Sequence, residues 1–224
     1  MSQVIVTKEM QITIVYDNEA LRDDLISGWG FSALIQGEGI PTMLFDTGGD
    51  SFTLLHNMEE LGIDSEKLEV VVISHPHGDH TGGLPEILRR NPSTELYVTK
   101  SFREKGIGRK ITVVDKVTEI CKDIFSTGEL SGMEQSLVLR LNYGVFVLTG
   151  CSHPGPARIL SAASKIGKLY GIAGGFGPHD PEEFRSFPDL SLIYPCHCSV
   201  YKREMGKMFP DKVGKCGVGL KINL

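Results

Sequence analysis

The chain has 224 residues, of which 41% are hydrophobic, and this size suits a single α/β domain over residues 1–224. The formal net charge is −5 and there is no long basic run, so we do not expect a nucleic-acid groove, whose affinity depends on neutralising phosphates. The sequence has no apolar stretch long enough to span a membrane, and residues 1–8 lack the features of a signal peptide, so we expect a cytoplasmic protein without a membrane partner.

Strands and helices are predicted to alternate along the first half of the chain. The expected strands cover 11–16, 31–36, 42–45, 70–73 and 95–98. The expected helices are a short one within 20–27, one that begins at 50–51 and ends at Gly62, and one around 84–91.

The second half repeats this strand and helix pattern. Strands are expected at 111–114, 117–125, 136–142, 144–148, 169–172, 190–194 and 218–224. Helices are expected over 159–167, from 180 to 183 with a proline in the first turn, and over 200–209. Recurring strand-to-helix units suit two packed sheets with helices outside.

Four ligand-type side chains occur within six positions directly behind the apolar run 70–73. They are His75, His77, Asp79 and His80. In an extended chain alternate residues point the same way, so we expect the first three to converge and His80 to reach a second point. Two imidazoles on one ion, with an imidazole and a carboxylate on its neighbour, can build a compact two-metal centre.

The stretch 75–80 reads His-Pro-His-Gly-Asp-His and resembles the H-x-H-x-D-H motif of the metallo-β-lactamase superfamily. Within that superfamily the chain is similar to the small dihydropterin synthase-like proteins of the methanopterin-pathway type, from about Gln11 to the C-terminus. The matching pieces are 16–19, 44–48, 74–84, 148–155, 174–176 and 195–198. The resemblance implies a four-layer αββα sandwich with metals at one edge, between the sheets.

The resemblance also implies two later ligands, His153 in the string 149–155 and His197 between two cysteines. We expect one metal on His75, His77 and His153, and the other on Asp79, His80 and His197. It stays open which of His153 and His197 binds which metal. Two divalent ions are expected, zinc with iron or manganese as alternatives, since histidine and carboxylate ligands suit all three.

Cys151 occupies the position where the superfamily often has a carboxylate that bridges the metals. It is either a small buried apolar residue or a thiolate near the metals that favours softer ions. Without a bridging carboxylate the second metal is expected to be held weakly, and Glu129 and Glu134 are candidate substitute acids. The chain has five cysteines, an odd number without a Cys-x-x-Cys pair, so we expect reduced thiols and no disulfide framework.

Three further features are candidates for supporting roles. Asp46 is expected to accept the free ring N–H of a ligand histidine, and Asp17 either does the same or forms a turn. His179 lines the substrate cleft or belongs to a surface loop. The basic residues within 100–110 form either a solvated face or an anion-binding rim for a phosphorylated substrate.

These residues favour hydrolysis of a small-molecule ester, thioester, lactone or phosphoester through a metal-bound hydroxide. Two cations lower the pKa of a shared water, and Asp79 is expected to orient this nucleophile and accept its proton. The resemblance implies an alternative, a dihydropterin synthase that joins a pterin to an aminobenzene-ribosyl phosphate. A third hypothesis is a di-iron redox protein or a metal-binding protein without turnover.

Overall fold

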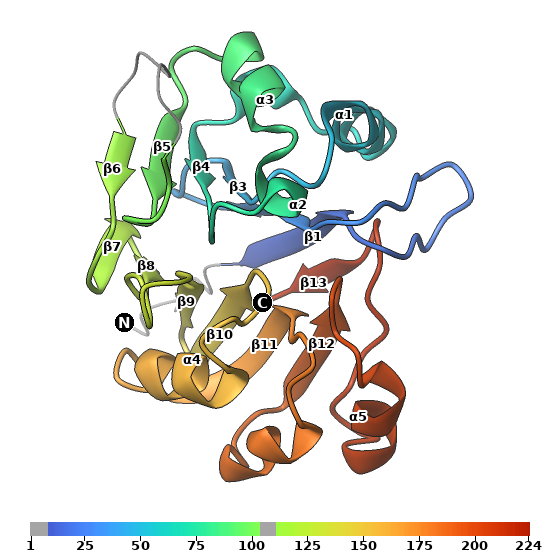
Figure 1. Ribbon diagram of the computed structural model, residues 1–224, viewed down its shortest axis with the longest axis vertical. Coiled ribbons are helices and arrows are strands. Elements are labelled where there is room, and N and C mark those ends of the chain that lie inside the picture. The colour runs from blue at the N-terminus through green and yellow to red at the C-terminus, as the bar shows by residue number, and fades with distance from the viewer. Residues whose placement is uncertain (1–8, 104–110) are drawn as a thin grey trace, which may run out of the picture.

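The computed structural model describes residues 9–103 and 111–224. Two β-sheets pack face to face with helices on their outer sides (Figure 1). Part of the basic cluster, Lys105, Arg109 and Lys110, lies outside the described residues. None of the helices formed by residues 9–103 and 111–224 is long and apolar enough to cross a membrane.

The first sheet contains strands mainly from the first half of the chain, in the order β13-β1-β2-β3-β4-β5-β6. The pairs from β13 to β3 are antiparallel and those from β3 to β6 are parallel. The strands are β1 (Met10–Tyr16), β2 (Ser32–Gly37), β3 (Met43–Phe45), β4 (Val70–Val72), β5 (Glu95–Val98), β6 (Ile111–Val113) and β13 (Lys221–Asn223).

The second sheet has the order β12-β11-β10-β9-β8-β7. Strands β10, β11 and β12 are parallel, and the remaining pairs are antiparallel. The strands are β7 (Thr118–Cys121), β8 (Ile124–Ser126), β9 (Leu137–Leu141), β10 (Gly144–Thr149), β11 (Leu169–Gly175) and β12 (Leu192–Cys196).

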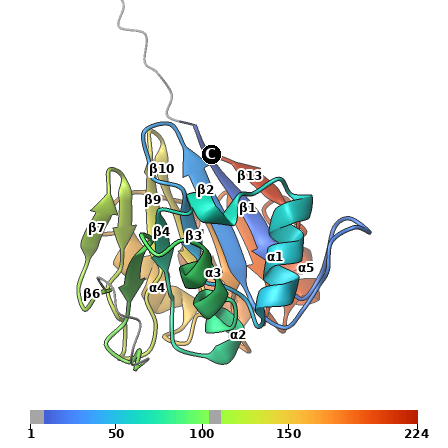
Figure 2. The same cartoon turned by 90° about the horizontal axis from the view of Figure 1, so that it is seen from above.

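The helices cover the outer faces of both sheets. Figure 2 shows α1 and α3 in front of the first sheet and α4 and α5 on the far side of the molecule. The helices and turns are α1 (Ser51–Glu60), η1 (Ser65–Lys67), α2 (Gly78–Thr81), α3 (Leu84–Arg90), α4 (Pro156–Ala163), η2 (Pro181–Ser186) and α5 (Lys202–Met208).

Three apolar clusters hold these layers together. Ile12 and Phe45 of the first sheet meet Phe146 of the second sheet in the central cluster. Val15 faces the opposite way and joins the cluster beneath α1 and α3, because successive side chains of a strand alternate between its faces. A third cluster seats α4 and α5 on the second sheet through residues such as Ile159. The expected four-layer αββα sandwich is confirmed.

Two local predictions are wrong. Residues 20–27 form no helix but bends and turns, because the Asn57 side chain accepts the backbone N–H of Ile26 at 2.8 Å and ties the segment to α1. The run 117–125 is not one strand. It contains β7 and the start of β8, joined by a turn in which Asp123 takes a left-handed φ of 68°.

The expectation of reduced cysteines is wrong for one pair, because Cys196 and Cys216 form a disulfide with a Cα–Cα distance of 5.3 Å. The bond joins the end of β12 to the segment that leads into β13. The two cysteines are 20 residues apart. Only the fold brings them together, so their spacing carries no local signal.

Candidate metal centre

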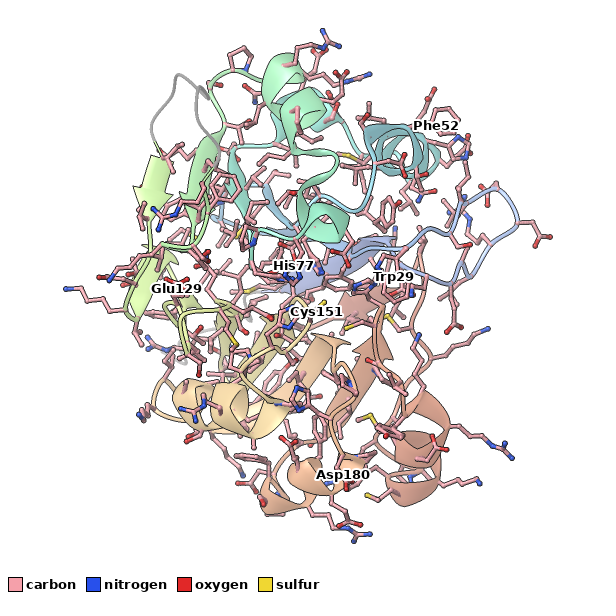
Figure 3. All side chains as sticks on the ribbon, in the orientation of Figure 1. Trp29, Phe52, His77, Glu129, Cys151 and Asp180 are labelled. Carbon is pink, nitrogen blue, oxygen red and sulfur yellow. A yellow bond between two sulfur atoms is a disulfide. The ribbon has the colours of Figure 1, made fainter. Side chains whose placement is uncertain are left out.

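The predicted ligands gather where the loops after β4, β10 and β12 meet. Figure 3 shows His77, Cys151 and Trp29 in the region between the two halves of the molecule. The carboxyl ends of parallel strands share one edge of a sheet, so the loops that follow them converge there. The predicted ligand side chains form two groups, and a third group of ligand-type residues, Asp17 with Cys196 and Cys216, contains the disulfide.

The first group contains His75, His77 and His153, and we call it the three-histidine group. The Nε2 atom of His75 lies 3.1 Å from Nδ1 of His77 and 3.2 Å from Nε2 of His153. A tetrahedral zinc ion with Zn–N bonds of 2.0–2.1 Å separates its ligand nitrogens by about 3.3 Å. Three ring nitrogens therefore converge at a spacing that suits one ion.

The proton on His75 is directed away from this point. Ser74 Oγ donates to Asp46 Oδ2 at 2.7 Å, so it accepts from Nδ1 of His75, 2.8 Å away. The lone pair of Nε2 then faces the other two histidines. Burial, together with the neighbouring His80, His153 and His77, lowers the pKa of His75 far below its usual range. The ring is therefore neutral, as a metal ligand must be.

The second group contains Asp79, His80, Cys151 and His197, and we call it the mixed-donor group. Cys151 Sγ lies 3.1 Å from Nε2 of His80, and Asp79 Oδ2 lies 3.2 Å from Nε2 of His197. Among the buried side-chain nitrogen and oxygen atoms of residues 9–103 and 111–224, Nε2 of His197 alone has no hydrogen-bond partner. A buried, unpaired nitrogen is costly unless a ligand satisfies it.

The outer nitrogens of both histidines in this group are held by polar partners. Asp46 Oδ2 accepts from Nδ1 of His80 at 2.7 Å, and Asn18 Oδ1 accepts from Nδ1 of His197 at 2.9 Å. Such hydrogen bonds fix the tautomer and the ring orientation of metal-binding histidines. Asp46 therefore occupies the position that the sequence predicts for it, and Asn18 has the same function although the sequence gives no separate signal for it.

The local chain path at Asp79 differs from the extended one that the motif predicts. The strand ends at Val72, residues 74–76 form bends and residues 78–81 form the short helix α2, so the loop and not strand alternation brings His75 and His77 together. The turn carries Asp79 away from the three-histidine group and next to His80. Burial alone raises the pKa of Asp79, but the nearby His197 and His80 outweigh burial and lower that pKa.

Glu134 organises the loop that carries Cys151 and His153. Its two carboxylate oxygens accept the backbone N–H groups of residues 150–153 at 2.8–3.2 Å. Glu129 accepts the backbone N–H groups of residues 100 and 101 instead. Neither carboxylate belongs to the three-histidine group or to the group of Asp79, His80, Cys151 and His197, so their function as substitute metal acids stays a prediction.

Three residues in these loops have left-handed backbone conformations. Asp46, Ser152 and His197 have φ values of 58°, 57° and 42°. Such conformations are unfavourable for residues other than glycine and tend to occur at functional sites. The backbone N–H of His197 donates to Asp17 Oδ2 at 2.7 Å, which holds this conformation and gives Asp17 a function beyond turn formation.

The remaining predicted residues lie outside both groups. His179 Nδ1 lies 3.4 Å from a carboxylate oxygen of Glu183. The His179 ring also lies next to Gly155, two residues after His153. Lys100, in the basic cluster, pairs with Asp115 at 2.9 Å. A pocket beside the three-histidine group is lined by His75, Pro76, His77, Ser101, Gly132, Met133 and His153.

Comparison with known proteins agrees with this architecture. The family model described as the metallo-beta-lactamase superfamily matches residues 30–132. The solved structure of Tm1679, a metal-dependent hydrolase of the beta-lactamase superfamily, is 26% identical, with a TM-score of 0.79 over 96% of this chain and 99% of that one. Zinc-bound PqqB from Methylobacterium extorquens shares the fold, at 12% identity and a TM-score of 0.62. The chain therefore has the metallo-β-lactamase fold, and its residues 30–132 are similar to that superfamily.

Within the superfamily the chain is similar to a curated protein of Methanocaldococcus jannaschii. That protein is 7,8-dihydropterin-6-methyl-4-(β-D-ribofuranosyl)-aminobenzene-5′-phosphate synthase. It is 26% identical, and the match covers 86% of this chain and 88% of the relative. An uncharacterized protein from the same organism, also 26% identical, is covered over 91% of its length. The predicted resemblance to the methanopterin-pathway type is therefore confirmed.

Proposed function

We propose that the protein is a metal-dependent hydrolase that acts on a small-molecule ester, thioester, lactone or phosphoester. The observation that carries this proposal is the buried, unpaired Nε2 of His197, directed at the carboxylate of Asp79. A bound cation satisfies this nitrogen without requiring a proton on it. The similarity to a metal-dependent hydrolase over nearly the whole chain supports the same class.

The donors fit two divalent ions, one in each group. The three-histidine group supplies three ring nitrogens, and the mixed-donor group supplies a carboxylate, two imidazoles and a thiol. Both sets suit zinc, with iron and manganese as alternatives for the nitrogen and oxygen donors. When bound, such ions supply Lewis-acid chemistry, lowering the pKa of water and polarising a substrate oxygen.

Asp79 is the catalytic residue in this proposal. Its side chain is 20% exposed, and the lowered pKa keeps it a carboxylate at neutral pH. It can therefore orient an attacking water and accept its proton. His77 and His153 are exposed, and they border the pocket formed with Met133 and Ser101, which gives a small substrate access to the centre.

Metal content and turnover, measured on protein purified without chelator, test this proposal. We expect two equivalents of metal per chain and hydrolysis of at least one substrate from an ester, thioester, lactone and phosphodiester panel. Chelation is expected to abolish turnover and added zinc to restore it. Two bound ions without turnover of any substrate contradict the hydrolase, and iron absorption bands support the redox alternative.

The second candidate is a dihydropterin synthase, favoured by the similarity that covers 86% of this chain and 88% of the M. jannaschii synthase. In this reaction the amine of an aminobenzene-ribosyl phosphate displaces diphosphate from a dihydropterin-6-methyl diphosphate. The test mixes both substrates with the metal-loaded protein and follows the coupled product by mass spectrometry. Product that requires both substrates and disappears in Asp79→Asn supports the synthase, whereas hydrolysis of the diphosphate alone supports the hydrolase.

A further inference from the structure

We propose that Trp29 stacks against a planar heteroaromatic ring of the substrate at the rim of the mixed-donor group. This inference rests on the proposed function, because it takes the metal centre as the reaction site. Trp29 is the chain's one tryptophan, and it is 65% exposed. A tryptophan side chain is large and gains much from burial, so folding gives no reason for this exposure.

The ring of Trp29 lies directly beside one of the predicted metal ligands. Its centroid is 5.0 Å from that of His197, and the two planes meet at 64°, an edge-on arrangement. Figure 3 shows Trp29 between the two halves of the molecule, near His77 and Cys151. A ring stacked on Trp29 therefore lies next to the site of the proposed chemistry.

The backbone on both sides of Trp29 is fixed. Gly28 N donates to the Asp17 carbonyl at 3.0 Å, and Gly30 N donates to Asn18 Oδ1 at 3.3 Å. A Cβ atom on Gly30 would lie 2.5 Å from the Asp79 carbonyl oxygen, so no larger side chain fits there. The exposed indole is thus mounted on a tightly packed turn.

These contacts connect the turn to the metal centre itself. Asn18 also holds His197, Asp17 accepts the backbone N–H of His197, and Phe31 N donates to the Asp79 carbonyl at 3.2 Å. An aromatic side chain on a rigid support loses little conformational freedom when a ligand binds. The indole is therefore a pre-organised surface at a fixed position relative to Asp79 and His197.

The chemistry of the indole identifies the ligand class. In the described part of the chain, the aromatic ring contact of Trp29 is the one with His197, and Trp29 is 65% exposed, so much of the indole surface is available to a ligand. Sites for quaternary ammonium ions surround the cation with several aromatic faces. A single flat face instead suits a planar ring, and stacking on aromatic side chains tolerates many ring types because each has a π-face.

Equilibrium binding of pterin, a planar bicyclic probe, tests this assignment by isothermal titration calorimetry on zinc-loaded protein. We expect the Trp29→Ala change to raise the Kd for pterin about tenfold and Trp29→Phe to raise it only a few-fold. Phe52→Ala is the matched control, since Phe52 is 74% exposed on α1, outside both ligand groups. Ribose 5-phosphate, which has no flat ring, is expected to bind equally to all four proteins.

Equal pterin affinity in the wild type and Trp29→Ala overturns the proposal, as does a wild type that binds no pterin. A change in molar mass by light scattering in Trp29→Ala, with the pterin Kd unchanged, assigns Trp29 to contact with a second copy and also overturns it. Zinc content and turnover are measured on the same preparations. Protein that binds zinc and pterin but turns over nothing contradicts the proposed function and leaves the stacking result intact.

Discussion

The two ligand groups differ in burial, in donor chemistry and in the way their side chains are held. In the three-histidine group, His77 and His153 are exposed and every donor is an imidazole nitrogen. In the mixed-donor group, His80, Cys151 and His197 are buried, and nitrogen, oxygen and sulfur donors meet. The three-histidine group is therefore accessible from solvent, and the mixed-donor group lies mostly in the interior of the protein.

The hydrogen bonds that orient the histidines also differ between the two groups. His80 donates its Nδ1–H to a side-chain oxygen of Asp46, and His197 donates its Nδ1–H to the side-chain oxygen of Asn18. The three-histidine group has this kind of support at His75, through Ser74, and the backbone position of His153 depends on Glu134. Ligands that are pre-oriented by outer contacts bind metal more tightly. We therefore expect the mixed-donor group to retain its ion longer, opposite to the weak second site predicted from the sequence.

Asp79→Asn is expected to have the largest effect, because it removes the carboxylate proposed to accept a proton. We expect kcat to fall about 10²–10⁴-fold, with little change in the thermal melting of the metal-free protein. Glu129→Gln is the matched control, since this carboxylate is bonded to backbone N–H groups outside both ligand groups. Steady-state kinetics at full metal loading make the measurement, and equal kcat values for Asp79→Asn and the wild type contradict the catalytic assignment.

Acid is expected to destabilise the metal-free protein through the buried histidines. Burial is the main cause that lowers the pKa of His80 from 6.5 to about 3, with His197 nearby as the next cause. Between pH 6.5 and about 3, His80 is therefore protonated in the unfolded chain and neutral in the folded chain. Stability is therefore full above pH 6.5 and falls as the pH drops towards 3, by up to about 1.4 kcal/mol per pH unit for one histidine.

Urea unfolding of the metal-free protein between these pH values measures this dependence. His80→Gln is expected to flatten the acid limb, because a glutamine cannot take up the proton in the unfolded state. An acid limb of the same slope in His80→Gln and in the wild type would assign the pH dependence to other groups. His75, which is also buried and has a lowered pKa, accounts for a second part of the slope.

Asp46→Asn tests whether outer contacts account for the difference between the groups. The Asp46 carboxylate accepts three hydrogen bonds, two from Ser74 and one from His80. An amide nitrogen at one of these positions cannot accept, so the His80 ring loses its orientation. We expect zinc affinity at the mixed-donor group to fall about 10- to 100-fold, measured by competition with a chromophoric chelator. A loss confined to the three-histidine group would contradict the assignment of Asp46 to His80.

The sequence predicts the layers and the ligand types because both are local signals. The apolar run 70–73 and the donors that follow it lie within eleven positions, and β-strand alternation requires no tertiary information. The resemblance to the superfamily adds His153 and His197, which spacing alone leaves as ordinary loop histidines. The structure brings both next to the 75–80 motif, and their function as ligands stays a prediction.

Features that depend on contacts between distant segments are missed. Asn18 and His197 are 179 residues apart, and the hydrogen bond between them exists only once both sheets are formed. Nothing in the sequence near Glu134 indicates that it accepts hydrogen bonds from the backbone N–H groups of residues 150–153. Trp29 resembles any turn residue until its exposure and its contact with His197 are known. Supporting contacts are therefore less visible in a sequence than the ligands that they position.

Cys151 distinguishes the two groups by chemistry, and its substitution is expected to have the smallest effect. Its sulfur lies 3.1 Å from Nε2 of His80, where a thiolate donor favours softer ions. We expect Cys151→Ser to reduce cadmium binding at the mixed-donor group by more than it reduces zinc binding, each by a few-fold. Chelator competition with both ions on wild type, Cys151→Ser and the neighbouring Cys198→Ser measures the ratio. A cadmium-to-zinc ratio that is the same in all three proteins would mean that Cys151 packs as a small apolar residue, because an oxygen in place of a ligand sulfur must alter the preference between soft and hard ions.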